Sequence, residues 1–135
     1  MGDVTERREL PATTEQVWQA LTRPRSLEQW FWPPHFATTA EIELSPGGRY
    51  RIASPVAGMA VSGQYVQVQS PDLISFSWQW DGEDTESVVT IGLSGTGAST
   101  ELSLAHVGLA ESEVANHVQG WTDCLDRLPA WLAGH

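Results

Sequence analysis

The residues best suited to chemistry are two histidines and one cysteine in the last third of the chain. His117 and Cys124 are seven positions apart, which is about two helical turns or roughly 10 Å along a helix axis. His106 precedes them in a segment where it alternates with Leu102 and Leu104. These spacings match no metal-binding pattern and no nucleophile–base pair. We therefore expect no metal and no cofactor, and we interpret the three residues as part of a core or of the rim of a pocket.

Other signatures of catalysis are missing from the sequence. It contains no glycine-rich phosphate loop, no serine elbow and no paired-cysteine motif. The Pro46-Gly47-Gly48 segment predicts a hairpin turn, because no helix is expected after it. An enzyme that uses His106, His117 or a tyrosine as an acid or base is the alternative, and it requires a partner within hydrogen-bond distance.

Charge and composition exclude several classes of partner. Seventeen acidic residues against seven basic ones give a net charge of −10, which disfavours binding to nucleic acid or to an anionic membrane surface. No apolar run approaches the roughly 18 residues of a membrane span. One cysteine cannot form an intramolecular disulfide, so we expect a cytoplasmic protein.

Aromatic residues are the unusual part of the composition, since seven of the 135 residues are tryptophan. Large rings fill cores, and they also line apolar pockets; both interpretations are open. For the second, the candidate ligand-binding residues are Trp30, Trp32, Tyr50, Tyr65, Phe76, Trp78, Trp80, His106, His117, Trp121 and Cys124.

The element that must position many of them is a predicted helix over 111–135. Six apolar residues there recur at intervals of three and four, which places them on one helical face; we expect Ser112 to cap the helix. Gly120 indicates either close packing against a strand or space for a ligand beside Trp121, and Pro129 predicts a bend. The apolar residues are Val114, Val118, Trp121, Leu125, Leu128 and Leu132.

Two short helices and a set of strands precede it. A strand over 4–10 is rich in charge and so belongs near a sheet edge. Thr13 and Gln16 form a capping-box pattern for a helix that ends near Thr22, and Pro24 opens a second short helix. Alternating polarity predicts about six further antiparallel strands. They cover 40–44, 49–52, 61–69, 73–80, 87–93 and 102–106.

Finer details of the strands are predicted as well. A three-residue loop at 46–48 would pair Leu44 with Tyr50 and Glu43 with Arg51. In the strand over 61–69, alternation places Val66 and Val68 on one face and Tyr65 and Gln67 on the other. Residues 94–99 are expected to form a loop.

This order of elements resembles the helix-grip, START-like (SRPBCC) superfamily, and within it the family named after the activator of the heat-shock-protein-ninety ATPase. The resemblance covers nearly the whole chain. It implies one α+β domain over residues 1–135, in which a curved antiparallel sheet wraps around a long C-terminal helix, often with a cavity between them. The matching segments are 17–22 with Pro24, Trp30-Phe31, Pro46-Gly47-Gly48 with Tyr50, Gly63, Ser70-Pro71-Asp72, 100–106 and Gly120-Trp121.

The resemblance implies function less closely than fold. Our first expectation is a binding module for a small apolar or aromatic molecule. An enzyme of the polyketide cyclase, dehydratase or hydrolase type is the first alternative. The second is a dimeric interaction protein that uses exposed aromatic residues around Trp30-Phe31-Trp32. The resemblance assigns the co-chaperone activity to longer proteins with an additional domain, so we do not expect it of this chain.

Overall fold

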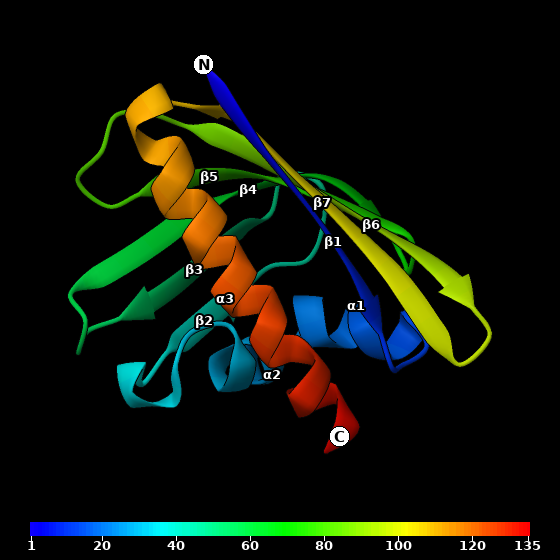
Figure 1. Ribbon diagram of the computed structural model, residues 1–135. Helices are drawn as coiled ribbons and strands as arrows, with labels where there is room; N and C mark the ends of the chain where they lie inside the picture. Colours follow the sequence, from blue (N-terminus) through cyan, green and yellow to red (C-terminus); the bar gives the residue numbers. More distant parts are fainter.

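The computed structural model describes all 135 residues as one curved sheet crossed by a long helix (Figure 1). The seven strands are antiparallel and lie in the order β1-β7-β6-β5-β4-β3-β2. This confirms the α+β helix-grip fold expected from the sequence. The strands are β1 (Gly2–Leu10), β2 (Thr39–Ile42), β3 (Arg49–Ser54), β4 (Met59–Gln69), β5 (Leu73–Trp80), β6 (Ser87–Thr96) and β7 (Ser99–Leu109). The helices are α1 (Thr14–Thr22), α2 (Pro24–Trp30) and α3 (Val114–Ala133), with 3₁₀ turns η1 (Pro34–Phe36) and η2 (Glu111–Glu113).

The two short helices begin where local chemistry places them. The Thr13 hydroxyl accepts a hydrogen bond from the Gln16 backbone N–H, and the Gln16 side chain accepts one from the Thr13 N–H. These bonds satisfy two donors that the first helical turn leaves free. Pro24 occupies the first turn of α2, where its missing N–H costs nothing. Both helix starts are confirmed, and α1 and α2 lie beside the C-terminal half of α3 (Figure 1).

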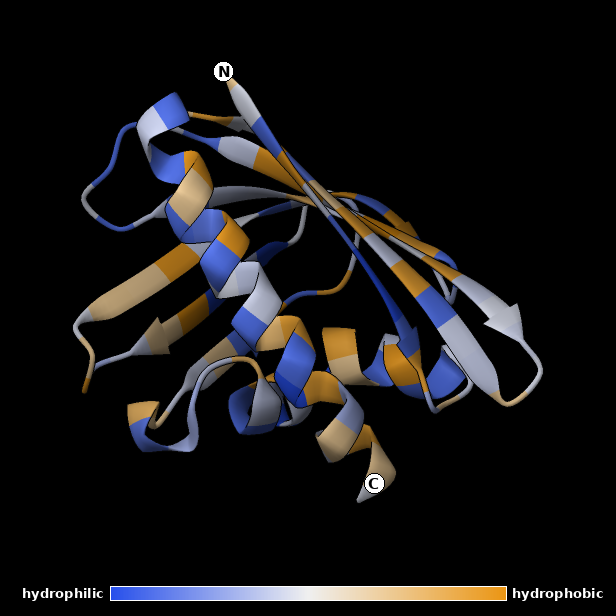
Figure 2. Ribbon diagram, viewed as in Figure 1, coloured by the Kyte–Doolittle hydropathy of each residue, from blue (hydrophilic) through white to orange (hydrophobic).

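Alternation along the strands builds the core between the sheet and α3. Figure 2 shows apolar and polar residues alternating along the ribbons of the sheet. On β5, Ile74 and Trp78 are buried, while Phe76 and Trp80 are half-buried against the core. Neighbouring strands contribute a further buried apolar row from β6 and β7. That row contains Val89, Ile91, Leu93, Leu102 and Leu104.

The unbroken alternation predicted along β4 was wrong. A register shift between Tyr65 and Gln67 marks a β-bulge, in which an extra residue interrupts the alternation. Tyr65 is consequently buried and Val68 packs against the core, whereas Val66 is exposed. A period-of-two pattern does not reveal an inserted residue, and this is why Val66 rather than Tyr65 was grouped with Val68.

Two hairpins also differ from their predicted form. Ile42 lies opposite Tyr50 and Glu41 opposite Arg51, two residues earlier on β2 than expected, because the connection spans 43–48. A shift of two preserves the faces, so the charged side of the hairpin remains exposed. Residues 94–99 are mostly strand, since β6 and β7 pair up to Thr96 and Ser99 and leave only a short turn.

Helix α3 buries a face slightly rotated from the predicted one. Its buried residues include His117 and Cys124 as well as Trp121, Leu125, Leu128 and Leu132. Val118 lies at the edge of this face and is 39% exposed, so its expected burial was wrong. Ser112 makes no capping bond because η2 precedes the helix. The helix continues through Pro129 to Ala133.

Candidate functional site

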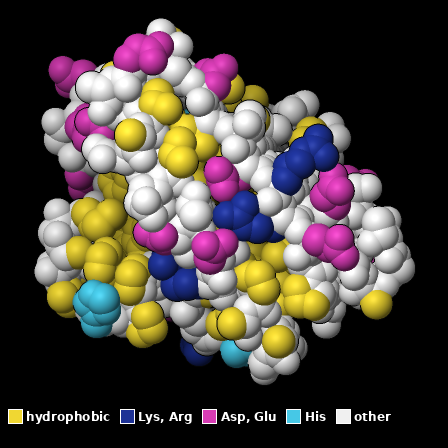
Figure 3. Space-filling view, viewed as in Figure 1, with side chains coloured by type: hydrophobic (Ala, Val, Ile, Leu, Met, Phe, Trp, Pro, Cys, Tyr) yellow, Lys and Arg dark blue, Asp and Glu magenta, His cyan; other side chains and the backbone are white.

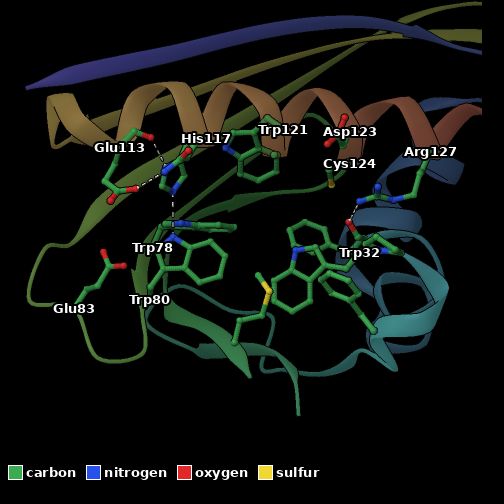
Figure 4. A pocket seen from close by; sticks show the side chains of 16 residues that line it. Trp32, Trp78, Trp80, Glu83, Glu113, His117, Trp121, Asp123, Cys124 and Arg127 are labelled. Carbon is green, nitrogen blue, oxygen red and sulfur yellow. Dashed lines mark hydrogen bonds between the residues drawn. The ribbon is translucent and has the colours of Figure 1, made fainter. Parts of the chain in front are cut away.

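A pocket of about 460 Å³ lies between α3, the end of β5 and the segment around η1. Figure 3 shows apolar side chains gathered in a hollow beside α3, and Figure 4 shows the residues that line it. Volumes of roughly 300–1,000 Å³ are usual for small-molecule sites. The apolar wall consists mainly of Trp32, Phe36, Met59, Trp78, Trp80 and Trp121.

Gly120 explains part of this empty space. It lies on α3 among the lining residues, and a Cβ atom built on it would meet no atom within 4 Å outside its own helix. The close packing that the sequence favoured for this glycine is therefore wrong. Its missing side chain instead leaves room beside Trp121, as in the alternative interpretation.

Polar residues at the mouth come from three separate elements. Glu83 follows β5, Glu113 ends η2, and Asp123 and Arg127 are on α3. The Arg127 guanidinium donates from Nε to the Trp30 carbonyl at 3.1 Å and from Nη2 to the Phe31 carbonyl at 2.6 Å. Arg127 thus ties α3 to the last carbonyls of α2 and fixes the position of the Phe31 and Trp32 rings.

His117 joins α3 to the sheet at one end of the pocket. The Trp80 indole N–H donates to Nε2 of His117 at 3.1 Å. Because an indole can only donate, Nε2 carries no hydrogen. The Nδ1–H of His117 therefore donates to the Glu113 carbonyl, 2.8 Å away. Figure 4 shows Trp80 and His117 together at this end and Arg127 at the other.

His106 forms a second link between α3 and the sheet. It is fully buried, and it carries its hydrogen on Nε2 where His117 carries it on Nδ1. Its Nδ1 accepts from the Trp121 indole N–H at 3.0 Å, so Nε2 carries the hydrogen and donates to the Ser87 hydroxyl at 2.7 Å. Burial, with a smaller contribution from His117, lowers the pKa of His106 to about 3. Neither histidine has a ring nitrogen without a protein partner, and neither is paired with a carboxylate.

A second group of aromatic residues fills its space almost completely. Tyr50, Tyr65 and Phe76 pack with ring centroids 5.3–6.1 Å apart, around a void of only about 30 Å³. That volume is close to one water molecule. The Tyr50 hydroxyl donates to the Ser77 carbonyl at 2.6 Å, and burial raises the pKa of both tyrosines. This part of the predicted site is packed core.

Cys124 lines the pocket but is not prepared for nucleophilic chemistry. Its side chain is 3% exposed, and burial raises the pKa of its thiol to about 12. Reactive cysteines show the opposite shift, because the thiolate is the nucleophile. We therefore treat Cys124 as a small apolar wall residue.

The structure divides the predicted ligand-binding residues into three groups. Trp32, Trp78, Trp80, His117, Trp121 and Cys124 line the pocket. Trp30, Tyr50, Tyr65 and Phe76 surround the small void, together with Trp78 and Trp121. His106 lines neither cavity and acts as a buried support for Trp121. Ligand contact by any of them stays a prediction.

Several lining residues were missed from the sequence. Met59 and Glu83 lie in or beside loops, and Asp123 and Arg127 lie outside the apolar stripe of the last helix. Charged residues flanking an apolar helical stripe are the only available signal for a pocket mouth. They are equally typical of a solvated surface, so the sequence could not decide between the two.

The aromatic surface expected around Trp30-Phe31-Trp32 was also wrong. The three residues are 2%, 6% and 9% exposed, because the Trp30 indole N–H donates to the Ala20 carbonyl and Phe31 packs edge-on against Trp121. A homodimer stays a prediction, but it cannot use these rings. None of the helices is both long enough and apolar enough to cross a membrane.

The sheet, its enclosed helix and the pocket between them define a helix-grip domain of the START-like class. The chain belongs to the family described as Activator of Hsp90 ATPase homolog 1-like protein, whose sequence profile matches residues 11–133. No curated protein matches the chain.

Solved structures agree with this assignment. CalU16 from Micromonospora echinospora is 27% identical with a TM-score of 0.79, over 96% of this chain and 75% of that one. DynU16, described as a protein in the dynemicin biosynthetic locus, is 28% identical with a TM-score of 0.83, over 97% of this chain and 47% of that one. PFC0360w, an HSP90 activator from Plasmodium falciparum, shares the fold at 21% identity and a TM-score of 0.81, over 97% and 96% of the two chains.

Proposed function

We propose that this protein binds a small apolar or aromatic molecule in the pocket between α3 and the sheet. The observation that carries the proposal is the open space beside Gly120, bounded by Trp32, Trp80 and Trp121. The volume of this open pocket lies in the range usual for small-molecule sites. An apolar ligand would bury ring surface that the unliganded protein leaves in contact with water.

The geometry favours binding over catalysis. A general acid or base needs an available proton-transfer atom facing the reacting group. The ring nitrogens of His117 are engaged by Trp80 and Glu113, and His106 lies outside the pocket. The pKa of Cys124 is raised to about 12, which removes it as a nucleophile at neutral pH. The proposal therefore assigns no reaction to the protein. We also propose a cytoplasmic location, because the single cysteine cannot form an intramolecular disulfide.

Filling the pocket tests the proposal. The uncharged fluorescent probe N-phenyl-1-naphthylamine should bind the wild-type protein with an emission increase that titrates to saturation. Gly120→Phe places a ring where a Cβ meets no neighbour. We expect it to lower the affinity for the probe at least about tenfold, which corresponds to roughly 1.4 kcal/mol of binding free energy.

Gln119→Phe supplies the matched control. Gln119 is the preceding helical residue, is exposed and does not line the pocket; the same ring there should leave probe affinity unchanged. If both variants bind the probe as the wild type does, or if the wild type does not bind it at all, the proposed pocket function is wrong.

A further inference from the structure

One buried polar atom of the pocket wall has no hydrogen-bond partner. Trp78 is 4% exposed, and its indole N–H makes no hydrogen bond. The neighbouring indoles of Trp80 and Trp121 both donate to histidines. A buried donor without an acceptor costs about 1–3 kcal/mol, and an acceptor from outside the chain would remove that cost.

Trp78 is placed where such an acceptor could enter. It lines the main pocket, and it also lines an adjoining polar hollow of about 180 Å³. Trp80 and His117 line both spaces too, and Figure 4 shows Trp78 beside them. The Trp80 ring lies edge to face with Trp78, with centroids 5.4 Å apart. Trp80 is half-buried, and its side chain is held by the hydrogen bond to His117.

The charge of the lining restricts the ligand further. Glu83, Glu113 and Asp123 contribute three carboxylates, and none of them forms an ion pair. Arg127 is the one arginine or lysine of the lining, and its Nε and Nη2 atoms donate to the Trp30 and Phe31 carbonyls. A ligand carboxylate would meet three carboxylates against one guanidinium, an excess of like charge.

We infer that the ligand is an uncharged aromatic molecule with a carbonyl-type oxygen, which accepts the N–H of Trp78. This inference rests on the proposed pocket function and specifies its ligand class. The Nε1 atom exposes less than 1 Å², so the pocket wall around it has to open before the oxygen reaches it. The ring system of the ligand then packs against Trp32 and Trp121.

Three naphthalenes of similar size test the inference: 2-acetylnaphthalene, 2-ethylnaphthalene and 2-naphthoate. We expect the ketone to bind about fivefold more tightly than the hydrocarbon, the worth of one neutral hydrogen bond, and the carboxylate to bind most weakly. In ¹H–¹⁵N spectra of the wild-type protein, the Trp78 indole signal should move downfield with the ketone and not with the hydrocarbon. Through-bond experiments assign that signal without any substitution.

Trp78→Phe removes the donor and keeps an aromatic ring, so it should abolish the preference for the ketone while both neutral probes still bind. Equal affinity of the wild type for the two neutral probes, with an unmoved Trp78 signal, would overturn the inference and leave the pocket function standing. A preference for 2-naphthoate would overturn it as well. If none of the three probes binds, the pocket function fails together with the inference.

Discussion

The indole N–H of Trp121 and Nδ1 of His106 meet at 3.0 Å across the seam between α3 and β7. This bond fixes the tautomer of a histidine that is fully buried, with Ser87 at its other nitrogen. Protonation of Nδ1 would destroy the acceptor and leave two buried donors facing each other. The pair therefore links the helix to the sheet only while His106 is neutral.

Stability should consequently fall as the solution becomes acidic. The pKa of His106 is lowered from 6.5 to about 3 in the folded protein, so between these values the unfolded chain binds more protons than the native one. The stabilising contribution is fully present above pH 6.5 and is lost as the pH falls toward 3. We expect a loss of about 1–2 kcal/mol between pH 7 and pH 5, measured by urea unfolding.

His106→Gln isolates this contribution. Glutamine keeps an acceptor and a donor but does not titrate, so the variant should show a flatter dependence on pH over the same interval. An unchanged slope in the variant would assign the effect to other groups.

Gly120→Ala should stabilise the protein. Glycine inside a helix costs about 0.5–1 kcal/mol relative to alanine, and a Cβ at this position meets no neighbour. We expect the free energy of unfolding to rise by about that amount. Gly63→Ala is the contrasting variant, because its Cβ would clash with the Ser77 backbone carbonyl, and it should destabilise. Destabilisation by Gly120→Ala would restore the close-packing interpretation.

Removing the Arg127 guanidinium should loosen the end of α2. Arg127→Met keeps the aliphatic stem but removes the hydrogen-bond donors to the Trp30 and Phe31 carbonyls. Hydrogen bonds to charged groups contribute about 1.5–3 kcal/mol to stability. We expect a loss of about 1–3 kcal/mol and faster amide exchange at the C-terminal end of α2. The control Arg25→Met, at an exposed position on α2, should change the free energy of unfolding by less than about 0.5 kcal/mol.

Cys124 should resist alkylation in the folded protein. With its thiol pKa raised from 9.0 to about 12, the thiolate fraction at pH 8 falls about a thousandfold. Iodoacetamide should thus label native protein at least that much more slowly than protein unfolded in urea. Similar rates in the two states would mean that α3 opens easily at this point.

The sequence was sufficient for the elements whose patterns are regular. The alternating polarity of residues 73–80 predicted β5, and the capping box at Thr13 predicted the start of α1. Several errors in the strands and helix ends lie where a regular pattern is interrupted. The bulge beside Tyr65, the η2 turn before α3 and the longer hairpin loop after Ile42 depend on tertiary geometry rather than on periodicity.

The site was less predictable than the fold. The aromatic residues that meet between sheet and helix were identified, but the tight packing of Tyr50 and Phe76 and the open space around Trp32 look alike in sequence. Whether rings leave a gap depends on sheet curvature and on the packing of neighbouring rings, which composition does not record. Only Gly120 offered a local signal of open space, and a glycine in a helix has several possible meanings.

The bulge in β4 gives the strand one residue more than its pairing needs. Tyr65 lies opposite Phe76, Gln67 opposite Ser75 and Val68 opposite Ile74, so Val66 has no counterpart on β5. Deleting Val66 would leave every other side chain of β4 on its present side of the sheet, whereas deleting a neighbour such as Tyr65 would remove a core residue. Val66 is thus the residue of β4 that can be deleted without moving the side chains beyond it to the opposite face of the sheet.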